Sequence, residues 1–114
     1  MTTKAEKLWR LQFGDSNTGK DYAGSIVHFD EYGKKSNFGW NIEHITPESL
    51  GGTDAYTNLT VANVNNNSLR ADRTSWNLNG TNFQVKKVDG YSSSGIYDIS
   101  NPHQPKLLTK SHKF

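Results

Sequence analysis

Hydrophobic positions near the start of the chain follow a helical period. Thr3 and Glu6 form a capping-box pattern, and Gly14 is typical of the residue that follows a helix end. The pattern therefore predicts a helix over about residues 4–13 that packs through one apolar face. The residues of that face are Ala5, Leu8, Trp9 and Phe13.

Short runs rich in β-branched and aromatic residues predict strands farther along the chain. The expected strands are 25–29, 40–42, 58–61, 75–78, 81–85 and an edge strand at 96–99. The Asn-Gly pair at 79–80 is a strong signal for a two-residue hairpin. In that register Leu78 faces Thr81 and Trp76 faces Phe83, which gives the hairpin an apolar side.

The stretch 39–73 combines two of these strands with a polar segment. A loop at 46–56 that contains proline and glycine separates the two strands. The Asn-rich segment 63–67 then leads into residues 68–73, which can be helical. The order predicts two strands and a helix that hold one metal site between them.

Glu43 and His44 carry the candidate chemistry of this stretch. Neighbours in a regular strand point to opposite faces, so the two side chains converge only if the strand ends or bends there. Pro47 favours such an end. A carboxylate and an amide oxygen are hard ligands suited to Mg²⁺ or Mn²⁺, and a neutral imidazole can take a proton from water. The combination suits phosphodiester hydrolysis.

Taken in order, these residues resemble the HNH endonucleases, which have the ββα-metal fold. The shared elements are Glu43-His44-Ile45 with Pro47, Gly51-Gly52, Asn58-Leu59, and Asn67 within the segment 66–73. A looser likeness to a phage- and plasmid-type branch extends from Leu8-Trp9 through Phe83. The resemblance implies an α+β fold: a ββα-metal (HNH) core with an N-terminal helix, an extra strand and a C-terminal β-hairpin.

The resemblance also implies a role for each matching residue. His44 matches the general base, and Glu43 matches the acidic metal ligand, where many members have Asp. Asn67 matches the helix residue that completes the metal site, with Mg²⁺ or Mn²⁺ as the expected cofactor. Asn58 matches the middle residue of the motif, a catalytic residue that supports the loop and orients the base.

Each residue also has a purely structural interpretation. Taken alone, Asn67 is more often a turn former, His44 a hydrogen-bonded structural histidine, and Glu43 a solvated charge at a strand end. The ordered set, rather than any one member, favours a nuclease site.

Four basic residues are candidates for binding nucleic acid. Arg70 and Arg73 follow Asn67 at three-residue spacing, so a helix would carry them near the metal ligand. Lys34 and Lys35 lie at a hairpin end and could contact a phosphate backbone. For these residues a charged, solvated surface is the alternative.

The length and composition of the chain bear on which other classes of protein are possible. The chain has 114 residues, a net charge of +2 and no cysteine, which excludes disulfides and the Cys-ligated structural zinc of many family members. One domain is expected over residues 1–99, followed by a basic, disordered tail at 100–114. Because there is neither a long apolar run nor a signal peptide, a cytoplasmic protein without a membrane partner is expected.

The sequence thus predicts a metal-dependent endonuclease that cuts DNA, expected to be double-stranded, with weak sequence preference. Two alternatives stay open: an inactive nucleic-acid-binding module of a phage or plasmid assembly, and a ribonuclease or toxin nuclease. The oligomeric state is left open.

Overall fold

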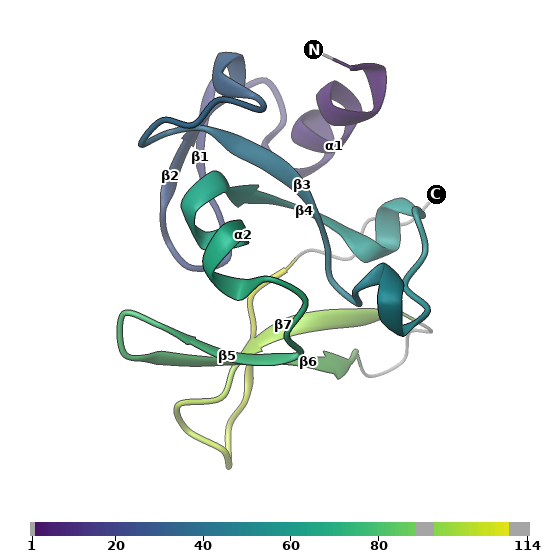
Figure 1. Ribbon diagram of the computed structural model, residues 1–114, viewed down its shortest axis with the longest axis vertical. Helices are drawn as coiled ribbons and strands as arrows, with labels where there is room; N and C mark the ends of the chain where they lie inside the picture. The colour runs from purple at the N-terminus through teal and green to yellow at the C-terminus, as the bar shows by residue number, and fades with distance from the viewer. Residues whose placement is uncertain (1, 89–92, 110–114) are drawn as a thin grey trace.

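The part of the chain that the structure describes contains two α-helices, eight strands and three short 3₁₀ helices, the last at Phe29–Glu31, Glu48–Leu50 and Tyr56–Asn58. Figure 1 shows their arrangement. The structure is a computed structural model, and it describes residues 2–88 and 93–109. The elements are α1 (Thr3–Phe13), β1 (Thr18–Lys20), β2 (Ile26–His28), β3 (Trp40–His44), β4 (Leu59–Asn63), α2 (Val64–Arg70), β5 (Ser75–Leu78), β6 (Thr81–Lys87), β7 (Ser94–Asp98) and β8 (Lys106–Leu107). The mixture of helices and strands confirms the α+β class.

The first helix confirms the predicted bounds and apolar face. Ala5, Leu8 and Trp9 are fully buried, and Gly14 ends the helix with a φ of 63°. Its N-cap is Thr2 rather than Thr3, since the Thr2 hydroxyl accepts a hydrogen bond from the Ala5 N–H at 3.2 Å. The capping-box prediction was therefore wrong by one residue.

The strands β3 and β4 form an antiparallel hairpin between two hydrophobic cores. Leu59 and Val61 of β4 face one core, which α1 and β2 share, whereas Ala62 faces the other, built mainly on the C-terminal sheet. This division follows from the two-residue period of a strand whose two faces are both covered. Helix α2 begins directly after β4, so the expected strand, strand and helix follow one another.

The segment N-terminal to this hairpin contains one more strand than predicted. Residues 18–20, which were not among the predicted strands, form β1 and pair with β2. The single extra strand of the prediction is therefore a two-stranded ribbon.

The C-terminal hairpin has the predicted register, with Leu78 opposite Thr81 and Trp76 opposite Phe83. It belongs, however, to a four-stranded sheet in the order β5-β6-β7-β8. The strand expected at the edge is therefore internal. Residues 106–107 form the edge, and the hydroxyl of Thr109, which is buried, accepts a hydrogen bond from the Ile96 N–H.

The disordered-tail prediction is thus wrong for residues 106–109, because residues 106–107 pair with β7 and Thr109 is buried. The last residues, 110–114, lie outside the described part. Among the described residues, no helix is long and apolar enough to cross a membrane.

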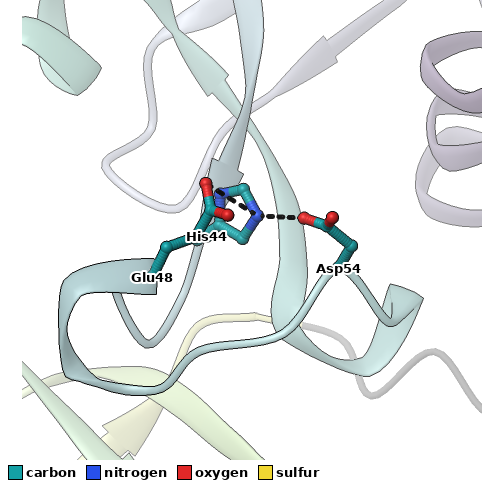
Figure 2. Close-up of side chains that lie close together, drawn as sticks. All are labelled: His44, Glu48 and Asp54. Carbon is teal, nitrogen blue, oxygen red and sulfur yellow. Dashed lines mark hydrogen bonds and ion pairs between the residues drawn. The ribbon is translucent and has the colours of Figure 1, made fainter.

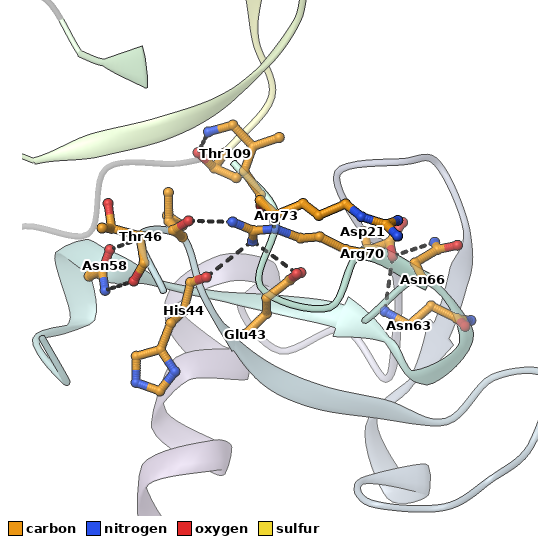
Figure 3. A network of polar contacts seen from close by, with 12 residues as sticks. Asp21, Glu43, His44, Thr46, Asn58, Asn63, Asn66, Arg70, Arg73 and Thr109 are labelled. Carbon is orange, nitrogen blue, oxygen red and sulfur yellow. Dashed lines mark hydrogen bonds and ion pairs between the residues drawn. The ribbon is translucent and has the colours of Figure 1, made fainter. Parts of the chain in front are cut away.

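A buried carboxylate ties the N-terminal ribbon to the start of α2. Asp21 accepts hydrogen bonds from the backbone N–H groups of Ala23, Ser25 and Asn63, and from the amide of Asn66, all at 2.9 to 3.0 Å. Figure 3 shows part of this network. It joins segments more than 40 residues apart in sequence.

Replacing Asp21 by Ala should lower the free energy of unfolding by about 3 kcal/mol, because several donors lose a charged acceptor and two are buried. Urea unfolding measures the loss. Asp21→Asn, which keeps one acceptor oxygen, should lose less, and Asp15→Ala, at an exposed position, should change stability by at most about 0.5 kcal/mol. Equal stability of Asp21→Ala and Asp15→Ala would contradict this account of the network.

Candidate functional site

The candidate site lies at the end of β3. Glu43 and His44 are the last two residues of this strand, and they pair with Thr60 and Leu59 of β4. Their side chains leave the strand on opposite sides, as Figure 3 shows. The strand does end at His44, as expected, but it stays regular up to that point, so each side chain has its own surroundings.

The Glu43 side chain turns inward and meets Arg70, the last residue of α2. Glu43 is 4% exposed and Arg70 is 1% exposed, and their side chains are joined at 2.9 Å. Three further guanidinium N–H groups donate to the backbone carbonyls of His44, Ile45 and Arg73. The guanidinium also lies 4.2 Å from the ring centroid of Trp76.

The prediction that Arg70 contacts nucleic acid was therefore wrong, although Arg70 does lie beside Glu43, as the spacing indicated. Its guanidinium is buried and hydrogen-bonded within the protein, so it cannot contact a phosphate group. The physical reason is that α2 packs against β3, β4 and β5, which turns this side of the short helix into the interior. Spacing alone did not reveal which side of the helix is covered.

The two oxygens of the Glu43 carboxylate differ in their hydrogen bonding. Its Oε1 bonds to Arg70, but among the described residues its buried Oε2 has no hydrogen-bond partner. Burial raises the pKa of the Glu43 carboxyl to about 7, against the opposing effect of the Arg70 charge. A buried carboxylate oxygen without a donor is a position where a hard cation would fit.

A cleft of about 310 Å³ connects the predicted residues. Glu43 and His44 from β3 line it together with Asn67 from α2. The other lining residues are Ile42, Pro47, Glu48, Ser49, Ala71 and Asp72. The three residues predicted for the metal and the base, which are separated by up to 24 positions in the chain, thus border one cavity.

On the outer side of β3, His44 meets two carboxylates from the loop that follows (Figure 2). Its Nε2 lies 2.7 Å from Oδ1 of Asp54 and 3.7 Å from Oε1 of Glu48. The hydrogen bond to His44 and, to a lesser extent, the charge of Lys4 hold the pKa of the Asp54 carboxyl below its ordinary value. One ligand atom of each of the three residues lies within 4.8 Å of the others.

Neither Glu48 nor Asp54 was predicted as a site residue from the sequence. Both lie in the loop 46–56, on either side of the glycine pair at 51–52. The available signal was an acidic residue four positions after His44 and another ten positions after it. Nothing in that spacing determines where an irregular loop brings the second carboxylate.

Asn58 holds this loop in shape. Its Oδ1 accepts a hydrogen bond from the Thr46 N–H, and its amide donates to the carbonyls of Thr46 and Thr53. These bonds provide the loop support that was expected of Asn58. Gly52 is required in the same loop, because a Cβ atom there would lie 1.8 Å from the Thr46 carbonyl oxygen.

The other candidate contacts with nucleic acid lie on the surface. Lys34 and Lys35 are exposed in the segment between β2 and β3. Arg73 is also exposed, but it lies beyond α2, which ends at Arg70 because Ala71 takes a positive φ of 52°. Arg73 bonds to the Leu69 carbonyl. The prediction of a helix through Arg73 was therefore wrong.

Comparisons with known proteins identify the central part of the chain. Searches of curated proteins and of solved structures each give no match. The family model described as HNH endonuclease matches residues 22–76. That segment contains the β3–β4 hairpin, α2 and the cleft between them. This match confirms the resemblance to the HNH endonucleases seen in the sequence.

Proposed function

We propose that this protein is a metal-dependent endonuclease that hydrolyses phosphodiester bonds in DNA. The observation that carries the proposal is the common cleft of Glu43, His44 and Asn67, inside the segment that matches the nuclease family. An acid, an imidazole and an amide at one cavity are a donor set suited to this reaction.

His44 acts as the general base. It is 24% exposed, so its imidazole can meet water at the edge of the cleft. It removes a proton from the water that attacks the phosphorus atom. Asn58 contributes indirectly, because it fixes the loop that packs beside His44.

Glu43 and Asn67 are the residues that would hold a Mg²⁺ or Mn²⁺ ion. The unpartnered Oε2 of Glu43 and the amide oxygen of Asn67 are both hard donors. When bound, such an ion neutralises charge on the phosphate and on the leaving oxygen. Arg70 holds the other oxygen of Glu43 and so keeps the carboxylate in one orientation.

The exposed cations Arg73, Lys34 and Lys35 bind the phosphate backbone of the substrate. Contacts of this kind position a duplex without reading its bases, so sequence preference is weak. Double-stranded DNA is the proposed substrate, and parallel assays with single-stranded DNA and RNA separate it from a ribonuclease.

Substitution of His44 by Ala should lower kcat for plasmid nicking by about 100-fold to 10,000-fold, because the general base is lost. The assay compares Mg²⁺ and Mn²⁺ with excess chelator, which should abolish cleavage. His103→Ala, which removes an exposed histidine from the C-terminal segment, is the matched control and should cleave normally. Undiminished cleavage by His44→Ala would refute the assignment of the base.

The Asn67→Ala variant should need a metal concentration about tenfold higher for half-maximal nicking, because one oxygen donor is lost. A titration of rate against Mg²⁺ concentration measures this change. Asn65→Ala, an exposed neighbour on the same helix, serves as the control. If both variants have the wild-type metal dependence, Asn67 is not a ligand.

Replacement of Arg73 by Ala should weaken DNA binding uniformly across sequences and reduce the dependence of log K on log salt by about 1. Fluorescence anisotropy with duplexes of unrelated sequence, measured at several salt concentrations, gives both quantities. Lys34→Ala and Lys35→Ala should behave in the same way, whereas Lys106→Ala on β8 should bind as the wild type does. Indistinguishable salt slopes for all four variants would remove these cations from the interface.

A further inference from the structure

The loop that follows β3 is anchored on both sides of Asp54. The Thr53 carbonyl accepts a hydrogen bond from the Asn58 amide at 2.9 Å. The Asp54 carbonyl accepts one from Nζ of Lys4, on α1, at 2.8 Å. The Ala55 carbonyl accepts another from the Asn58 N–H. Asp54 therefore has a defined backbone position, although its side chain is 69% exposed.

This position places Oδ1 of Asp54 2.7 Å from Nε2 of His44. An ionised carboxylate accepts hydrogen bonds but has no proton to donate. The lowered pKa of Asp54 keeps its carboxyl group ionised near neutral pH. Nε2 must then carry the proton of a neutral imidazole. The lone pair lies on Nδ1, and no residue in the described ranges bonds to that atom.

We propose that Asp54 is a positioning residue that fixes His44 as its Nε2–H tautomer, so that Nδ1 is the nitrogen that removes the proton from water. The role of Nδ1 rests on the proposed nuclease function. As the O–H bond of water breaks, an N–H bond forms at Nδ1. The water oxygen bonds to phosphorus, and the bond from phosphorus to the leaving oxygen breaks. The Asp54 carboxylate then faces the positive charge of the imidazolium.

Glu48 provides the matched control. Its carboxylate is exposed to nearly the same extent, 68% against 69%, and it lies in the same loop. It approaches the same nitrogen, but only to 3.7 Å, which is too far for a hydrogen bond. Removal of either acid subtracts one negative charge near His44, whereas only removal of Asp54 also removes a hydrogen bond to the imidazole ring.

The tautomer can be read directly by long-range ¹H–¹⁵N NMR of histidine-labelled protein, without metal and at a pH of about 8.5, above the ordinary pKa of histidine. His44→Ala assigns the signals. Wild type and Glu48→Gln should show His44 with the proton on Nε2 alone. In Asp54→Asn the amide can donate as well as accept, so the Nδ1–H tautomer should appear.

Plasmid nicking supplies the kinetic comparison. Asp54→Asn should lower kcat about tenfold with KM within about twofold, a smaller loss than for a buried triad aspartate because this pair is exposed. Glu48→Gln should lose less kcat than Asp54→Asn, because it breaks no hydrogen bond to His44.

A wild-type His44 with a substantial Nδ1–H population would overturn the proposal, and so would a wild-type NMR pattern in Asp54→Asn. A loss of kcat in Asp54→Asn no larger than in Glu48→Gln would overturn it too. The NMR result does not depend on cleavage. If the protein cuts no nucleic acid in any metal, the proposed function fails while the pairing of Asp54 with His44 is still decided.

Discussion

The site depends most on the contacts of one buried group, the guanidinium of Arg70. Removing a cation from water costs several kcal/mol unless its donors are satisfied. Here the donors reach Glu43 and three backbone carbonyls, two of them at the end of β3. The ring of Trp76 covers the guanidinium from the side of the C-terminal sheet. One side chain thus joins α2, the site strand and the second hydrophobic core, and removing it would leave Glu43 buried without its counter-ion.

Polar side chains provide much of the long-range organisation in this chain. Only 32% of its residues are hydrophobic, and it has no cysteine to form a disulfide or a thiolate metal site. Asp21 and Asn58 instead bind backbone groups of distant segments, and the amide of Asn63 donates to the carbonyls of Ile26 and Asn37. Because these partners are backbone atoms in defined loops, the bonds determine loop shape as well as stability.

The alternation of side chains along β3 divides the site into two environments. Glu43 lies on the covered side, where burial leaves one of its oxygens without a donor. His44 lies on the other side, where its ring contacts an exposed carboxylate. Two neighbouring residues of one strand can thereby be suited to different tasks: Glu43 to binding a cation away from solvent, and His44 to acting as a solvent-accessible base. Both residues line the cleft between β3 and α2.

Local patterns in the sequence were sufficient for the elements whose signals lie within a few residues. The face of α1 and the turn at 79–80 with its strand register were predictable, since periodicity and turn chemistry act over short distances. The grouping of Glu43, His44 and Asn67 was expected from the resemblance to the HNH endonucleases. The burial of Arg70, the approach of Asp54 to His44 and the pairing of residues 106–107 were decided only by the tertiary structure. Each depends on which segment packs against a surface or on where an irregular loop brings a side chain, and neither spacing nor residue type determines that outcome.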